Sequence, residues 1–279
     1  NREICVCAHL TQTRHAQKTC AEMNDTNRIT YVKERFFHNF KPFDRVELSE
    51  RQTKKERRKN YEKEREKSLL IGSLFLAMFT VWTVLIQTVD VQPLGQNGTS
   101  IGFATFNCWF HHFTGVNMAI YTITDWMGLV PVVICLIFAG IGLVQLIKRR
   151  SLFRVDADIM ILGVYFVIVF LAYAIFEMIP INYRPILIEG IMEASYPSST
   201  TLLVLSVMPV LIEQIQRRLS GIGVKRIITI AAIAFSVFMV TGRLISGVHW
   251  FTDIVGGVLL SAGLFKLYKA AVMLALKEK

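Results

Sequence analysis

The chain has 279 residues, of which 53% are hydrophobic, and a mean hydropathy of +0.43. These values exclude an ordinary soluble domain of this length and indicate a protein integral to a membrane. The net charge of +10 does not indicate a nucleic-acid partner. The basic residues cluster in a tail and in short turns between apolar segments, where membrane proteins carry them.

The five cysteines indicate neither a disulfide framework nor a metal site. Three lie in the polar N-terminal tail and two lie in or near apolar segments, at positions 5, 7, 20, 108 and 135. The spacing of the cysteines and histidines in that tail fits no standard zinc site. We therefore predict neither a metal ion nor another cofactor.

Residues 1–67 are predicted to form a charged cytoplasmic segment, followed by a membrane domain over residues 68–279. The chain begins at Asn1, and no apolar core of signal-peptide type precedes residue 68, so Met23 is considered as the true start. Residues 45–67 mix both charge signs densely, which is typical of a solvated helix leading into a first span. The alternative is that their excess of Lys and Arg holds the segment against anionic lipid headgroups.

Six apolar segments follow, each about the 20 residues that a bilayer-spanning helix needs. They cover residues 68–89, 127–147, 159–179, 200–216, 227–246 and 253–273. The sequence thus predicts an all-α, polytopic bundle of six transmembrane helices. Residues 98–126 lack charge until Asp125 and are rich in aromatic side chains, so we expect a short helix there, lying along the outer interface.

The distribution of Lys and Arg predicts the orientation of the bundle. These residues crowd before the first span, after the second and fourth spans, and in the C-terminal tail. The connection over residues 90–126 has none, and the connection over 180–199 has only Arg184. We therefore predict a multi-pass protein of the cell membrane with both termini in the cytoplasm and the turn at residues 243–249 outside.

Arg184 and Arg243 are thus predicted on the side that otherwise avoids cations. An ionisable group at the membrane boundary is costly to keep there, which favours a partner of opposite charge. Two guanidinium groups from separate connections suit a phosphate-like oxyanion, because each guanidinium can donate two parallel hydrogen bonds to the oxygens of the anion. The alternative is that each arginine snorkels to the interface beside a helix end.

His249 and Asp253 are four residues apart, which would place both on one helical face and let the carboxylate accept a hydrogen bond from the imidazole. Such a bond would leave the other ring nitrogen as a nucleophile or base. Six positions separate Arg243 from His249, so we predict that the chain breaks between them, with Gly247 supplying the freedom. A purely structural pair that caps a helix is the alternative.

The run Ser198, Ser199 and Thr200 begins the fourth predicted span. Hydroxyl groups and free amides at a helix N-terminus favour a bound anion, so these residues are predicted to bind phosphate. The alternative is that the run simply caps the helix.

Three short motifs carry a resemblance to a known family. Within residues 243–253, Arg is followed after five residues by His and after three more by Asp, which resembles the third signature of the type 2 phosphatidic acid phosphatase superfamily. The stretch "NYRP" (182–185) resembles the end of the first signature, and "YPSST" (196–200) resembles the Pro-Ser-Gly-His second signature. The similarity covers residues 68–275, and the neighbouring sequence is similar to a bacterial subgroup.

The resemblance implies a membrane phosphatase that works through a phosphohistidine. His249 would attack phosphorus with the support of Asp253, and water would then release phosphate. Arg184, Arg243 and Ser198, with nearby backbone amides, would hold the phosphoryl oxygens. The substrate class would be a lipid phosphate or diphosphate in the bilayer, such as a polyprenyl diphosphate.

The sequence departs from the family pattern at three positions. Glu177 stands where the family has a lysine, Gly242 stands where it has a serine, and Thr200 replaces the histidine that protonates the leaving group. Threonine cannot act as that acid near neutral pH. These departures bring the activity into question, and His111, His112 and Glu193 are candidates for a relocated acid.

Two further functions therefore remain beside the phosphatase. A lipid phosphotransferase on the same scaffold would differ only in the acceptor that relieves the phosphohistidine. A catalytically impaired binder of phospholipid headgroups is favoured by the lost lysine and histidine.

Overall fold

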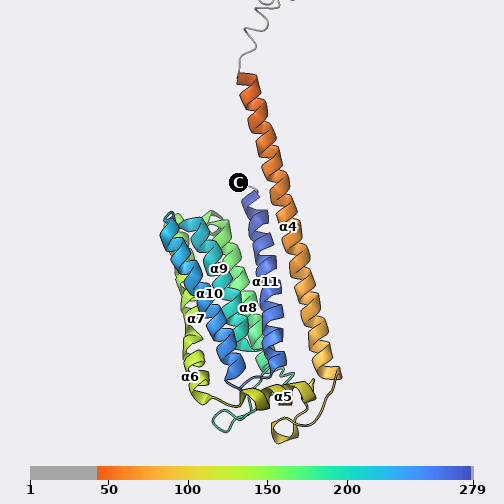
Figure 1. Ribbon diagram of the computed structural model, residues 1–279. Coiled ribbons are helices and arrows are strands. Elements are labelled where there is room, and N and C mark those ends of the chain that lie inside the picture. The colour runs from red at the N-terminus through yellow and green to blue at the C-terminus, as the bar shows by residue number, and fades with distance from the viewer. Residues whose placement is uncertain (1–42, 278–279) are drawn as a thin grey trace, which may run out of the picture. The chain divides into compact units, whose positions relative to one another are not determined.

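The computed structural model describes residues 43–277, so the predictions about Met23 and about the N-terminal cysteines and histidines lie outside the described residues. The described elements are helices, joined by loops that contain three isolated backbone bridges (Figure 1). Six helical segments are long and apolar enough to cross a membrane: Arg58–Thr88, Met118–Arg149, Ala157–Met178, Ser199–Arg218, Ile222–Ile245 and Phe251–Leu276. The predicted all-α, six-span, multi-pass architecture is thereby confirmed.

Helix α4 (Phe43–Thr88) contains the predicted charged helix and the first span without interruption. By its internal contacts the chain divides into residues 1–62 and 63–279. Within the second unit, the apolar part of α4 packs closely on α11 (Phe251–Lys277). A Cβ at Gly263 would come within 2.7 Å of Cδ2 of Leu76, so a small residue permits this approach, as is common between membrane helices.

Helix α9 (Ser199–Arg218) lies at the centre of the bundle, in contact with four other helices. These are α7 (Leu129–Arg149), α8 (Ala157–Met178), α10 (Ile222–Ile245) and α11. Its span is the most buried of the six, at 44% of its apolar window, and it also has the lowest mean hydropathy, at 1.3. A helix enclosed by other helices need not be as apolar as one that faces lipid, which explains the combination.

Two buried hydrogen bonds join α9 to its neighbouring helices. Gln214 donates a hydrogen bond to the Tyr268 hydroxyl at 3.0 Å, and the Tyr165 hydroxyl donates to the backbone carbonyl of Ser206 at 3.0 Å. A polar group without a partner is costly in the apolar interior of a membrane. These bonds therefore fix how α8 and α11 sit against α9.

The structure corrects the predicted interfacial helix over residues 98–126. Two helices occupy this stretch, α5 (Ala104–Thr114) and α6 (Met118–Met127), and α6 continues into α7 as the first part of the second span. The break between them lies at Gly115, whose φ is +65°, and the Asn117 side chain caps α6 by accepting a hydrogen bond from the Ile120 amide at 3.1 Å. Hydropathy alone did not predict that the second span begins in α6, because the polar residues of α6 shift the most hydrophobic part of the sequence toward α7.

The α7–α8 and α9–α10 connections, which carry basic residues, lie at one end of the bundle, and the α8–α9 and α10–α11 connections lie at the other (Figure 1). At one end, Arg149 bonds to Asp156 at 2.8 Å, and Arg218 bonds to Asp158 at 2.6 Å. The Arg149 bond also holds the pKa of Asp156 below its ordinary value. At the other end, the turn at Gly247 lies against the loop between α5 and α6. The charge asymmetry read from the sequence is therefore an asymmetry between the two ends of the fold.

This arrangement gives a matched test of the predicted orientation. In a background that lacks the five native cysteines, Ser100→Cys should react in intact cells with a thiol reagent that cannot cross the membrane, whereas Ser151→Cys should react only after permeabilisation. The two serines belong to loops at opposite ends of the bundle. If only Ser151→Cys were labelled in intact cells, the orientation would be the opposite of the predicted one, and Arg184 and Arg243 would lie on the cytoplasmic side.

Candidate active site

The loop between α8 and α9 doubles back on itself and presents Arg184 and Ser195 side by side. The Arg184 amide donates to the Glu193 carbonyl at 3.1 Å, and the Ser195 amide donates to the Asn182 carbonyl at 2.9 Å. The Trp250 indole N–H then donates to the carbonyl of Tyr183 at 2.9 Å. The loop is thus tied to the turn that precedes α11.

That turn lies between the end of α10 at Ile245 and the start of α11 at Phe251. Gly247 has φ +69°, and a Cβ there would come within 2.1 Å of the Gly115 carbonyl oxygen. Only glycine meets both the left-handed backbone and the close approach. The chain break predicted between Arg243 and His249 is therefore confirmed.

The predicted direct hydrogen bond between His249 and Asp253 is wrong. His249 Nδ1 lies 3.9 Å from Asp253 Oδ2, because His249 precedes α11 and so does not share a helical face with Asp253. The hydroxyl of Ser195 lies between them, at 3.1 Å from His249 Nδ1 and hydrogen-bonded to Asp253 Oδ2. Asp253 Oδ2 also accepts the Trp250 amide at 2.9 Å, as an acidic residue in the first turn of a helix often does.

Arg184 and Arg243 converge on one aromatic ring, although they come from separate elements. Their guanidinium carbons lie 5.8 Å and 5.0 Å from the centroid of Tyr121 on α6. Arg184 pairs with Glu193 at 3.0 Å, and Arg243 lies 3.5 Å from Asp125. The Arg243 side chain is 1% exposed, whereas that of Asp125 is 56% exposed. The buried arginine therefore forms its ion pair with a carboxylate at the protein surface.

Several polar atoms at this site lack a hydrogen-bond partner among the described residues. They include Nε and Nη1 of Arg184, Nε and Nη1 of Arg243, Oγ of Ser198 and Nε2 of His249, together with Nδ2 of Asn182 and Oδ1 of Asp253. A buried donor without a partner costs about 1–3 kcal/mol, and more when it is charged. Two cations, a hydroxyl and a ring nitrogen with spare hydrogen-bonding capacity form a site suited to a tetrahedral oxyanion.

The electrostatics of the site keep His249 neutral. Burial, followed by the charges of Arg184 and Arg243, holds the pKa of His249 well below its ordinary value. A neutral imidazole has a free electron pair on one ring nitrogen. The two arginines therefore favour an anion nearby and keep the imidazole neutral, with one ring nitrogen free to act as a nucleophile or a base.

The predicted phosphate-binding run over residues 198–200 is divided in the structure. Ser198 is buried just before α9, and its amide donates to the Asp253 backbone carbonyl at 3.0 Å. Ser199 lines a neighbouring pocket, and Thr200 lies beside Gly128, where a Cβ would be 3.7 Å from its methyl carbon. Ser198 thus belongs with His249 and the arginines, whereas the roles of Ser199 and Thr200 stay predictions.

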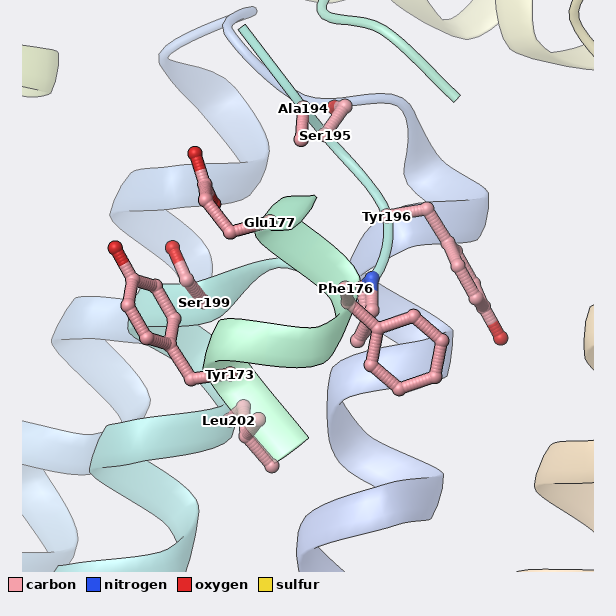
Figure 2. A pocket seen from close by; sticks show the side chains of 9 residues that line it. Tyr173, Phe176, Glu177, Ala194, Ser195, Tyr196, Ser199 and Leu202 are labelled. Carbon is pink, nitrogen blue, oxygen red and sulfur yellow. The ribbon is translucent and has the colours of Figure 1, made fainter. Parts of the chain in front are cut away.

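A pocket adjoins this site between α8, α9 and the loop that joins them (Figure 2). Figure 2 shows the oxygen atoms of Tyr173, Glu177 and Ser199 gathered on one side, and the rings of Phe176 and Tyr196 on the other. Ser195, which contacts His249, forms part of its wall, together with Ala194, Pro197 and Leu202. The carboxylate that replaces the family lysine therefore lines a space next to the reaction centre.

The candidates for a relocated acid are already engaged or lie at the surface. Glu193 is paired with Arg184 at 3.0 Å. A ring nitrogen of His111 lies 3.0 Å from the Gly247 carbonyl and stabilises the turn, while His112 is exposed on α5. The geometry favours none of the three as an acid at the phosphorus centre.

Sequence reasoning missed Ser195, Tyr121 and Asp125 as members of the site. Ser195 stands two residues before the proline of the second motif, and Asp125 is the first charge after a long uncharged stretch. Both sequence features were visible, but the contacts of these residues depend on how the loops fold.

Among the described residues, no group of three or more His, Cys, Asp or Glu side chains could hold a metal ion.

Comparisons with known proteins assign part of the chain to a family. The model of the PAP2 superfamily matches residues 159–275, a range that contains both arginines, Ser198, His249 and Asp253. Residues 159–275 belong to the PAP2 superfamily. The resemblance read from the three motifs is thereby confirmed, and the PAP2 match indicates a phosphoric ester hydrolase that acts on lipid in the membrane.

A solved structure also resembles the chain: the crystal structure of the first transmembrane PAP2 type phosphatidylglycerolphosphate phosphatase from Bacillus subtilis. The similarity covers 71% of this chain and 94% of that chain, with 20% sequence identity and a TM-score of 0.45. No curated protein matched the sequence.

Proposed function

We propose that the protein hydrolyses a lipid phosphate or diphosphate through a phosphohistidine on His249, at the extracytoplasmic end of the bundle. The observation that carries this proposal is the set of buried polar atoms without partners on Arg184, Arg243, Ser198 and His249, within the described residues. The PAP2 match over the same range supports it.

In the first step, Nε2 of His249 attacks phosphorus. A P–N bond forms while the bond to the leaving group breaks, and the leaving group takes the electron pair. Arg184, Arg243 and the Ser198 hydroxyl hold the three equatorial oxygens, where charge gathers in the transition state. Most of the catalysis then comes from positioning and charge stabilisation, which fixed and buried guanidinium groups supply.

In the second step, water attacks the phosphohistidine. The P–N bond breaks, its electron pair returns to Nε2, and inorganic phosphate leaves with the oxygen of water. His249 is then neutral again and ready for another cycle. The two arginines favour this neutral form, because they oppose a positive charge on the imidazole.

The decisive test is phosphate release by the detergent-solubilised protein, with a prenyl diphosphate and phosphatidic acid as separate substrates. We expect release of inorganic phosphate by the wild type and none by His249→Ala. A phosphotransferase would instead require an added lipid alcohol and would form a new phosphate ester. Substrate binding without either product would identify a binder of phospholipid headgroups and contradict the proposal.

A further inference from the structure

Ser195 makes three contacts that connect the two ends of the expected catalytic pair. Its hydroxyl lies 3.1 Å from His249 Nδ1, its backbone carbonyl oxygen lies 3.2 Å from the same nitrogen, and its hydroxyl is bonded to Asp253 Oδ2. All three residues are buried, with 2% or less of Ser195 and Asp253 and 3% of His249 exposed. The direct distance from imidazole to carboxylate, 3.9 Å, is too long for a hydrogen bond.

These contacts determine the direction of each hydrogen bond. The carbonyl of Ser195 can only accept, so Nδ1 of His249 must carry the proton. An ionised Asp253 can also only accept, so the Ser195 hydroxyl donates to it and accepts from Nδ1–H. The remaining nitrogen, Nε2, then has a lone pair, and it is the nitrogen that lacks a partner among the described residues.

We propose that Ser195 is the positioning residue through which Asp253 acts on His249. This inference rests on the proposed function, because it assigns the residue that orients the proposed nucleophile. Asp253 is fixed by the Trp250 amide at 2.9 Å at the start of α11 and in turn fixes the Ser195 hydroxyl. The hydroxyl and carbonyl of Ser195 then fix the ring and its tautomer.

The proposal explains why the hairpin-like loop between α8 and α9 is tied so firmly to α11. The Ser195 amide bonds to the Asn182 carbonyl at 2.9 Å, and the Ser198 amide bonds to the Asp253 carbonyl at 3.0 Å. The first bond closes the loop on itself, and the second joins the loop to α11, so together they restrict the position of Ser195 relative to the turn that carries His249. A shift of this loop would misplace the imidazole relative to phosphorus, and small misplacements of a nucleophile are costly.

A double-mutant cycle on kcat tests the link. Ser195→Ala and Asp253→Asn should each lower kcat by about 10- to 100-fold, the range found for residues that orient a functional histidine, with little change in KM. If Asp253 acts through Ser195, the double variant should be no slower than the slower single variant. Effects that multiply in the double variant would overturn the proposal, as would a fully active Ser195→Ala.

Control variants separate positioning from folding. Ser206→Ala removes another buried serine hydroxyl, which has no partner among the described residues, and should leave kcat unchanged. Ser195→Thr keeps a hydroxyl donor and should recover most of the activity, whereas Ser195→Cys offers only a weak donor and should not. Equal kcat for the threonine and cysteine variants would overturn the proposal even if Ser195→Ala fails to fold.

An NMR measurement tests the inference without turnover. In protein labelled with ¹⁵N-histidine, His249 should show the Nδ1–H tautomer, and its Nδ1–H resonance should move on Ser195→Ala because one of two acceptors is lost. The signal is assigned by its absence in His249→Gln. An Nε2–H tautomer, or a resonance unaffected by Ser195→Ala, would overturn the role of Ser195. A wild type with the expected resonance but no phosphate release would overturn only the proposed function.

Discussion

His249→Ala is expected to lower phosphate release by about 10⁴-fold or more, the loss typical when a covalent nucleophile is removed. The reason is geometric, because Nε2 of His249, Nε and Nη1 of the two buried arginines and the Ser198 hydroxyl all lack hydrogen-bond partners in the described part of the chain. Of the two described cysteines, Cys135 is buried in a core cluster, and Cys108 packs against an apolar cluster that includes Trp250. The measurement is the initial rate of phosphate release at saturating substrate, together with trapping of ³²P on the protein after an acid-free quench.

Asp253→Asn provides the graded comparison. It keeps an acceptor for the Trp250 amide, so α11 should still begin at the same place, and it leaves Nε2 of His249 intact. A measurable residual rate is therefore expected. Asp158→Asn is the matched control, because it breaks an ion pair with Arg218 at the other end of the bundle and should leave the rate unchanged. Wild-type turnover by His249→Ala would eliminate the phosphohistidine.

The sequence predicted the spans and the turn at Gly247 because each rests on a local property. Runs of apolar residues set where a helix can cross a membrane, and a glycine between Arg243 and His249 marks where the chain can turn. The convergence of Arg184 and Arg243 was also predictable, because charge at the membrane boundary needs a partner. Tyr121, which lies against both arginines, confirms that they meet.

The contacts that the sequence could not provide depend on the folded loops. The spacing of His249 and Asp253 suggested one helical face, but spacing does not say where a helix begins, and α11 begins between them. Ser195 could enter the gap only because the preceding loop doubles back through the Arg184 and Asn182 backbone bonds. Such pairings follow from tertiary packing rather than from periodicity.

The structure sharpens the consequence of the missing general acid. An alkoxide leaving group, whose conjugate acid is about as weak an acid as water, needs a proton in the transition state. A phosphate leaving group has a relevant pKa of about 6 and leaves without one. Thr200 cannot supply the proton, and Glu193 is bound to Arg184, so we propose that the protein cleaves a diphosphate faster than a monophosphate.

Glu177 is the remaining acid next to the reaction centre. It lines the pocket beside Ser195 and Ser199 (Figure 2), where a headgroup could lie. If it served as the acid, Glu177→Gln would lower turnover of a monophosphate and spare a diphosphate. If it does not, Glu177→Gln should change both rates by the same factor. We expect equal factors, because Glu177 lines this pocket and His249 is not among the residues that line it.

Thr200→His is therefore expected to raise hydrolysis of a prenyl monophosphate by about 10²-fold, the lower range of general acid catalysis, and to change prenyl diphosphate turnover little. Position 200 lies in the first turn of α9, two residues after Ser198, and corresponds to the position where the family pattern has its acid. Thr200→Val is the matched control and should give no gain, because it keeps the shape without an acid. The wild type itself should prefer the diphosphate. Equal wild-type rates on both substrates would contradict the leaving-group argument, and a loss of monophosphate turnover in His112→Ala would show that the acid has moved to α5.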